Sequence, residues 1–117
     1  MEGRSSLVWL EHPFIVPGGR FREVYYWDTL WTVKGLLRCG MVNTTRGMVE
    51  NFKHLIGQFS MIPNGNRSAA LESICRLNTR HPVGRVYYSR RSQPPVFGLL
   101  VGELLAALGP QEVRPYV

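Results

Sequence analysis

Three stretches of the chain repeat apolar residues every three or four positions, and this spacing constrains the fold more than any other feature. The clearest stretch lies between the Thr44-Thr45 pair and residue 60, with apolar side chains at Met48, Phe52, Leu55 and Phe59. Such spacing places these side chains on one face of a helix. We therefore predict a helix that Thr44 or Thr45 caps and that ends before the Pro and Asn-Gly loop at residues 61–66.

Two further stretches have the same periodicity. In residues 29–41 the apolar positions are Leu30, Val33, Leu37 and Met41, and Asp28 stands where an N-cap would be. In residues 92–108 they are Phe97, Leu100, Val101, Leu104, Leu105 and Leu108. Pro94 and Pro95 suit the start of this last helix, and Gly109-Pro110 suits its end. No sustained strand alternation competes with these patterns, so we predict an all-α fold of helical hairpins.

The loops between these helices are rich in Arg, aromatic, Asn and Gln side chains. Loops need no apolar stripe for packing, so such residues in them indicate a binding site. A polyhydroxylated sugar needs this combination, because a flat ring covers its C–H face while forked polar groups hold its hydroxyls. The same residues also fit a set of helix caps and partly buried aromatics, and composition alone leaves both interpretations open.

The charge, the hydropathy and the cysteine content limit which kinds of partner and cofactor we expect for this chain. The net charge is +6, with twelve Arg, two Lys and a single Asp. The Arg residues are scattered rather than aligned on one helix face, so we expect no nucleic-acid partner. No window approaches 18 uninterrupted apolar residues, so we expect no membrane span. Cys39 and Cys75 form no metal or redox motif. We expect Cys39 to be a buried thiol, and its pairing with Cys75 stays open.

One loop carries a long and specific motif. Residues 17–31 read PGGRFREVYYWDTLW, and this run resembles the first signature of trehalases, glycoside hydrolase family 37. Two later runs match the family pattern in the same order: IPNGNR at 62–67, and VYY at 86–88 followed by RSQPP at 91–95. The resemblance implies part of an (α/α)6 toroid, with the site at one end of the barrel in long loops between helices.

The resemblance also implies a reaction and its binding residues. Trehalases hydrolyse α,α-trehalose to two glucose molecules with inversion, and the pattern calls for no cofactor or metal. It implies these substrate-binding residues: Arg20, Trp27 and Asp28 in the first motif, Asn64 in the second, and Arg91, Ser92 and Gln93 in the third. Phe21 and Tyr25 would line the same pocket. Asp28 would then both cap a helix and accept sugar hydroxyl protons, which its two oxygens allow.

Two departures from the family accompany the match. Twelve barrel helices require several hundred residues, so we expect residues 1–117 to form a single partial domain that needs the rest of a trehalase domain. An inverting glycosidase also needs an acid and a base about 6.5–9.5 Å apart. The family has these carboxylates in later motifs, together with a Gln-Trp-Asp run that is absent here. We therefore expect an inactive chain, or alternatively a non-catalytic sugar-binding or interaction fragment.

Residues 68–85 are the second departure, because the family joins the Asn-Gly-Asn-Arg run directly to Val-Tyr-Tyr. We predict an insertion of 18 residues there. Residues 1–10 show no signal-peptide pattern. The resemblance permits an extracellular or lipid-anchored location and leaves a cytoplasmic one open. The Asn43-Thr44-Thr45 triplet fits an N-glycosylation acceptor and matters only in a secreted protein.

Overall fold

The described part of the chain is all-α, as predicted. The computed structural model describes residues 8–66 and 94–116. Its elements are α1 (Tyr26–Arg38), α2 (Val42–Phe59), α4 (Phe97–Leu108), α5 (Pro110–Val113) and the 3-10 turn η1 (Arg114–Tyr116). Within these ranges the β-pairing consists of two isolated bridges, Gly18 with Phe21 and Tyr25 with Gly65.

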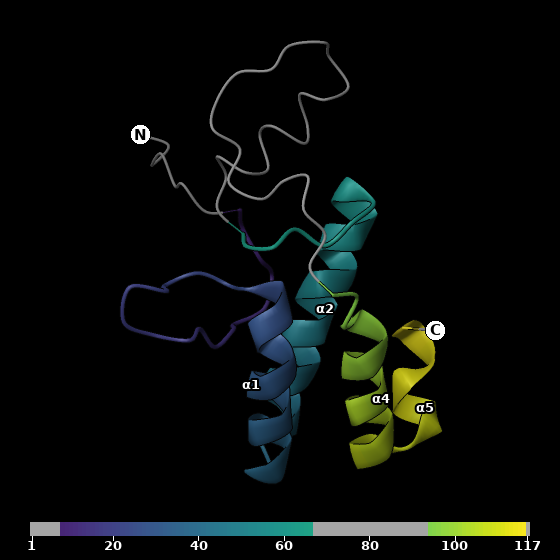
Figure 1. Cartoon of the computed structure of the whole chain (residues 1–117). Coiled ribbons are helices and arrows are strands. Elements are labelled where there is room, and N and C mark those ends of the chain that lie inside the picture. The colour runs from purple at the N-terminus through teal and green to yellow at the C-terminus, as the bar shows by residue number, and fades with distance from the viewer. Residues whose placement is uncertain (1–7, 67–93, 117) are drawn as a thin grey trace.

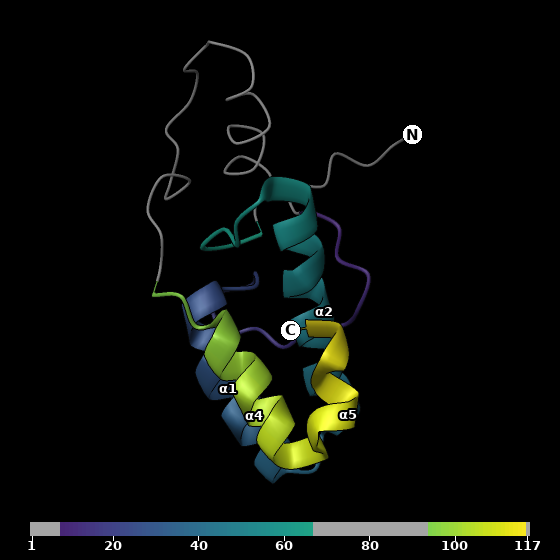
Figure 2. The ribbon, with the colours of Figure 1, turned by 90° about the vertical axis from the view of Figure 1, so that its right-hand side faces the viewer.

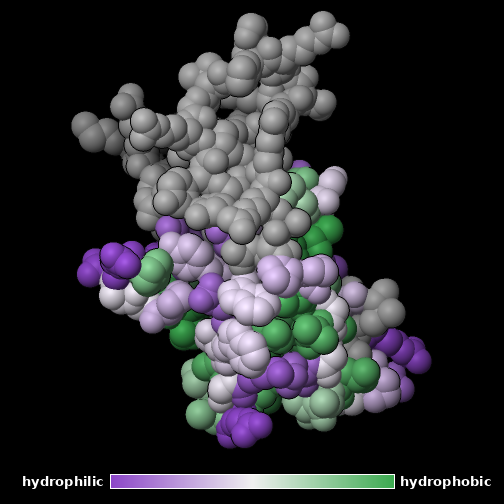
Figure 3. Space-filling view, in the orientation of Figure 1, coloured by the Kyte–Doolittle hydropathy of each residue, from purple (hydrophilic) through white to green (hydrophobic). Residues whose placement is uncertain are grey.

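The three long helices pack against one another around one apolar core. α1 and α2 run antiparallel as a hairpin, and α4 lies against both of them (Figures 1 and 2). The buried side chains on their facing sides include Leu30, Val33, Val49, Phe52, Leu55, Leu100 and Leu104. These belong to the apolar stripes that predicted the helices, which confirms the three helical segments. Apolar surface also remains on the outside, between hydrophilic side chains (Figure 3).

The start of α1 differs from the prediction, because Asp28 is not its N-cap. The N-cap is Tyr25, whose backbone is extended at φ −115° and ψ 127°, and Asp28 lies in the first turn. The backbone N–H and the hydroxyl of Thr29 both donate to the carbonyl of Tyr25, at 3.2 and 2.6 Å. The helix thus begins as soon as the extended pairing of Tyr25 ends, and it ends at Arg38, before Gly40 at φ 74°.

The starts of the other two long helices also differ from the prediction. α2 begins at Val42, and the hydroxyl of Thr45 donates back to the carbonyl of Met41 at 3.1 Å instead of capping the helix. α4 begins at Phe97 after Pro94 and Pro95, because Val96 serves as its N-cap. Its predicted end is confirmed, since Gly109 follows the last helical residue at φ 86°. The short helix α5 was not predicted, and it starts with Pro110 at a position that suits proline.

Two expectations about burial are wrong. Cys39 is a free, exposed thiol, because the chain has left α1 at this point and turns toward Gly40. Met41 was assigned to the apolar stripe of the first helix, yet it lies beyond the end of α1 and is 42% exposed. None of the helices within residues 8–66 and residues 94–116 is long and apolar enough to cross a membrane.

Candidate functional site

Two of the three motif runs meet at the N-terminal end of α1. Tyr25 and Gly65 form an antiparallel bridge, and the backbone N–H of Tyr26 donates to the carbonyl of Asn64 at 3.0 Å. We call this meeting point the loop junction and define it as residues 24–26, residues 64–66 and Val8. Because the pairing is between backbones, it sets the first motif against the second without using the side chains predicted to bind sugar.

Asn66 is the central polar residue of the loop junction, and it is only 1% exposed. Its side-chain oxygen accepts the backbone N–H of Val24 at 3.0 Å. Its side-chain nitrogen donates to the carbonyl of Val8 at 3.3 Å, and its own carbonyl accepts the N–H of Val8 at 2.7 Å. One buried residue therefore ties together three segments that are far apart in the sequence.

Glycines give the two motif loops their shape. A Cβ built on Gly65 would stand 3.3 Å from the carbonyl oxygen of Val24, so the close approach at the junction favours glycine. Gly18 and Gly19 have φ values of 100° and 59°, and Gly18 and Phe21 exchange backbone hydrogen bonds of 3.2 and 3.0 Å. The first motif thus begins with a tight turn that returns the chain toward α1.

Three of the predicted residues in the first motif contact one another. The rings of Phe21 and Tyr25 pack edge to face at 5.8 Å, and the guanidinium of Arg20 lies 5.2 Å from the Phe21 ring centre. The hydroxyl of Tyr25 donates to a carboxylate oxygen of Glu23 at 2.7 Å. Phe21 is 46% exposed, so this aromatic group remains open to a ligand while its members hold one another in place.

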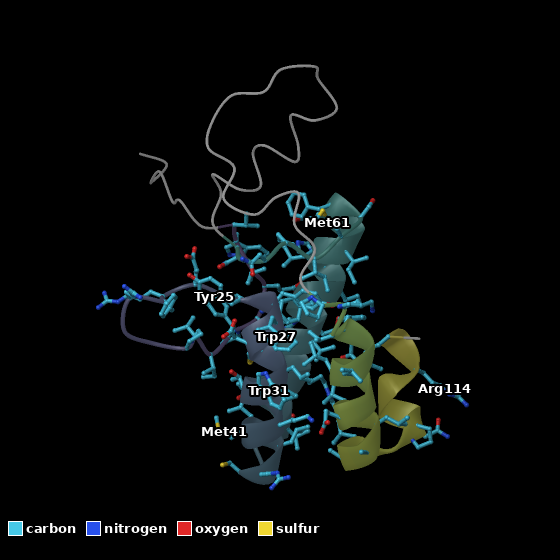
Figure 4. All side chains as sticks on the ribbon, in the orientation of Figure 1. Tyr25, Trp27, Trp31, Met41, Met61 and Arg114 are labelled. Atoms are coloured by element: carbon cyan, nitrogen blue, oxygen red, sulfur yellow. The ribbon has the colours of Figure 1, made fainter. Side chains whose placement is uncertain are left out.

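Trp27 and Asp28 lie in the first turn of α1, directly after the junction. Trp27 is 38% exposed and packs edge to face with Trp31, one helical turn further, at 6.2 Å between ring centres (Figure 4). Asp28 is exposed, and its carboxylate is at the helix end where the backbone dipole favours a negative charge. The two residues offer an exposed ring and an exposed carboxylate, groups that suit the C–H face and the hydroxyls of a sugar.

Tyr26, which was not among the predicted sugar-binding or pocket-lining residues, connects the junction to α4. Its ring packs edge to face on Phe52 at 5.4 Å, and its hydroxyl accepts the backbone N–H of Phe97 at 2.7 Å. Burial raises the pKa of this hydroxyl, while the backbone N–H groups of Phe97 and Val96 act in the opposite direction. The contact places the start of α4 beside the start of α1. Residues 94–95, the last two of the third motif, directly precede Val96, the N-cap of α4.

Other predicted features lie outside the described residues or away from the junction. Arg91, Ser92 and Gln93 and the predicted insertion at 68–85 lie outside them. A pocket of about 310 Å³ lies along α2 and contains none of the predicted sugar-binding residues; it is lined by Glu11, His12, Glu50, Lys53, His54, Gly57 and Gln58. Within the two described ranges, residues 8–66 and residues 94–116, no three His, Cys, Asp or Glu side chains form a set that would hold a metal ion.

Comparison of the sequence with known proteins identifies a family. A sequence model described as Trehalase matches residues 1–72. The chain is 43% identical to a trehalase of Oryctolagus cuniculus over 106 residues, which cover 91% of this chain and 15% of that protein. It is 46% identical to a periplasmic trehalase of Xanthomonas oryzae pv. oryzae over 109 residues, covering 93% of this chain and 16% of the relative. It is 45% identical to a Homo sapiens trehalase over 98 residues, 84% of this chain and 14% of the relative.

The chain therefore spans about 15% of the length of the curated relatives that it matches. The matches include the two motif runs that meet at the loop junction, since both lie within residues 1–72. The family resemblance stated from the motifs is confirmed: this chain belongs to the trehalase family.

Proposed function

We propose that this chain supplies part of the trehalose-binding site of an α,α-trehalase, an enzyme that hydrolyses α,α-trehalose to two glucose molecules with inversion. One observation carries the proposal: the backbone pairing of Tyr25 with Gly65 and of Tyr26 with Asn64 brings two family motifs together. This pairing puts Asn64 at the turn from which Trp27 and Asp28 emerge. The three described long helices would then be part of an (α/α)6 toroid.

The proposed roles follow from the chemistry of each group. The exposed ring of Trp27 offers a surface for the C–H face of a glucose unit. The carboxylate of Asp28 accepts hydroxyl protons, and the guanidinium of Arg20 donates to hydroxyl oxygens. Phe21 and Tyr25 would line the pocket. We assign Arg91, Ser92 and Gln93 to the same site through the third motif.

Trehalose binding by the full 117-residue chain tests the proposal. Titration with trehalose, followed by NMR shifts of the Trp27 indole, should saturate, whereas sucrose should not. Asp28→Ala and Arg20→Ala should each weaken binding about tenfold, because each removes a charged hydrogen-bonding group. Arg38→Ala is the matched control, since Arg38 is exposed at the opposite end of α1 and its loss should leave the affinity unchanged. Equal effects of Arg20→Ala and Arg38→Ala would contradict the assignment.

A glucose-release assay tests whether this chain catalyses hydrolysis on its own. We expect no hydrolysis by this chain alone, because the family's acid and base lie in motifs that it does not carry. Binding without hydrolysis supports a non-catalytic sugar-binding fragment of the enzyme. Hydrolysis by this chain that disappears with Asp28→Asn would contradict the assignment of the acid and base to the later motifs.

The proposal includes a location outside the cytoplasm. The Xanthomonas relative is named a periplasmic trehalase, and the family resemblance permits an extracellular or lipid-anchored protein. Cell fractionation with an antibody against this chain should find it in the extracytoplasmic fraction.

A further inference from the structure

Two buried asparagines each use their side-chain carboxamide to hold the backbone of segments outside the helices. Asn51 on α2 is 2% exposed, and Asn66 is 1% exposed. The side-chain oxygen of Asn51 accepts the backbone N–H of His12 at 3.0 Å, and its nitrogen donates to the carbonyl of the same residue at 2.8 Å. Asn66 also uses both atoms of its carboxamide, but it holds Val24 with the oxygen and Val8 with the nitrogen.

The two clamps differ in what they connect. Asn51 bonds a single residue, His12, which belongs to neither of the two motif runs at the junction. Asn66 reaches across 42 residues to Val24 and 58 residues to Val8, and it follows the Asn64-Gly65 pair directly. Val24 precedes the two residues that pair with Asn64 and Gly65. The hydrogen bond from Val24 to Asn66 therefore extends this pairing by one more contact on the side of the first motif.

We propose that Asn66 is a positioning residue for the trehalose site, a role that rests on the proposed function above. Its carboxamide locks residues 24–26 onto residues 64–66. Asn64 is thereby fixed relative to Trp27 and Asp28, which begin α1 from this anchored segment. A side chain of 1% exposure with both polar atoms in use leaves no group to contact the sugar, so Asn66 acts through its neighbours.

Substitution to alanine and to aspartate separates the two arms of the clamp. Asn66→Ala removes both side-chain hydrogen bonds. Asn66→Asp keeps an oxygen that accepts from Val24, but its second oxygen faces the carbonyl of Val8 and has no proton to donate. Asn51→Ala is the matched control, because it also removes two side-chain hydrogen bonds to the backbone, from a similarly buried asparagine outside the loop junction.

Amide hydrogen exchange on the full chain tests the positioning role without any ligand. Asn66→Ala should speed exchange of the Val24 and Tyr26 N–H groups by about tenfold or more relative to the wild-type chain. Local opening of the junction costs less free energy in this variant, because it no longer has to break the side-chain hydrogen bonds of Asn66. Asn51→Ala should speed exchange at His12 and leave Val24 and Tyr26 at the wild-type rate. Should Asn66→Ala fail to fold, Asn66→Asp answers the same question. Val24 stays protected, while the N–H of Val8 exchanges faster, because repulsion between the carboxylate and the Val8 carbonyl weakens the neighbouring backbone bond from Val8 to the carbonyl of residue 66. Wild-type protection at Val24 and Tyr26 in Asn66→Ala, or at Val8 in Asn66→Asp, overturns the proposal.

Trehalose affinity then shows whether positioning matters for binding. We expect Asn66→Ala to lose about tenfold or more in affinity, because a small displacement of binding groups is enough for such a loss. Asn51→Ala should stay within about twofold of the wild-type affinity, because its side-chain hydrogen bonds are to His12 and not to a residue of the motif runs. Both variants lose stability, so equal losses of affinity would reveal a merely structural role and overturn the proposal. A wild-type chain that binds no trehalose contradicts the proposed function instead, and the exchange rates still decide what Asn66 holds.

Discussion

The helical core and the loop junction are built from different interactions. In the core, the fully buried side chains Val33, Val49, Leu100 and Leu104 contact one another from three helices, so the stabilisation is spread over many apolar contacts. In the junction, a few backbone groups and one carboxamide make directed hydrogen bonds. Packing is non-directional, whereas a hydrogen bond specifies two atoms. The core therefore supplies the stability of this chain, and the junction supplies the geometry of its candidate site.

The largest expected effect comes from removing a core aromatic ring. Phe52 is 1% exposed and packs on the ring of Tyr26. Phe52→Ala leaves a cavity, and we expect the free energy of unfolding to fall by about 3–5 kcal/mol. Because domains of this size have about 5–15 kcal/mol in total, this variant should unfold at low urea concentration. Circular dichroism during urea denaturation measures the change.

Ile56→Ala is the control for this experiment. Ile56 lies one turn further along α2 and is 37% exposed. Its truncation should lower the free energy of unfolding by about 1 kcal/mol or less, because little buried surface is lost. Similar losses for the two variants would show that the described core is not where the stability of the chain resides.

Tyr26 belongs to both regions, and Tyr26→Phe tests the connection between them. The substitution keeps the ring contact with Phe52 and deletes the oxygen that accepts the N–H of Phe97 at 2.7 Å. We expect a loss of about 1–2 kcal/mol, because a backbone donor in a buried position loses its acceptor. Tyr25→Phe, at a half-buried ring, should change the free energy of unfolding by about 0.5 kcal/mol. Equal effects of the two substitutions would show that the hydrogen bond from Phe97 adds no more stability than the hydroxyl of a half-buried tyrosine.

The same variant, Tyr26→Phe, should also change how the stability of the chain depends on pH above neutrality. Burial raises the pKa of Tyr26 above its ordinary value of 10.0, so the folded chain disfavours the phenolate. The stabilisation from this residue is complete below the unfolded pKa and decreases as the pH rises from there through the folded pKa. Between about pH 9 and pH 11, Tyr26→Phe should therefore lose less stability than the wild-type chain. Parallel melting curves across this range would contradict the burial of the hydroxyl.

The two regions also differ in how far the sequence alone could predict them. The apolar stripes predicted the bodies of α1, α2 and α4, because packing depends on the periodicity that they record. They did not predict where the helices begin. α1 starts at Tyr26 because Tyr25 pairs with Gly65, forty residues away in the sequence, and no local cap signal contains that information.

The candidate site divides in the same way. The motifs identified Arg20, Trp27, Asp28 and Asn64, and the structure brings the backbones of their two loops together. Asn66 and Tyr26 were not among the predicted sugar-binding or pocket-lining residues, although both stand within the motif runs. Their roles depend on Val8 and on Phe97, which lie 58 and 71 residues away. Only the folded chain shows that these two residues are buried and in contact with other segments.

Matched glycine substitutions should have opposite signs in the two regions. Gly18 opens the first motif at φ 100°, where a Cβ is strained, so Gly18→Ala should lower the free energy of unfolding by about 1 kcal/mol. Gly35 is inside α1, and a Cβ there would have open space around it, so Gly35→Ala should stabilise the chain by about 0.5–1 kcal/mol. Urea denaturation of both variants measures the difference. A stabilising Gly18→Ala would show that the turn does not hold its left-handed backbone.

The smallest effect is expected for the ion pair between α1 and α4. The ammonium of Lys34 lies 3.3 Å from a carboxylate oxygen of Glu103, and it also lies 5.3 Å from the ring centre of Trp31. Both charged side chains are more than a third exposed, so solvent screens their attraction. Glu103→Gln should therefore change the free energy of unfolding by no more than about 0.5 kcal/mol, and the change should shrink further in about 1 M salt. Glu50→Gln removes a looser pair within α2, where Lys53 is 3.9 Å from Glu50, and should have less effect still. A loss above about 1 kcal/mol for Glu103→Gln that persists at high salt would contradict the comparison, because a single surface contact would then matter as much as a buried hydrogen bond of the junction.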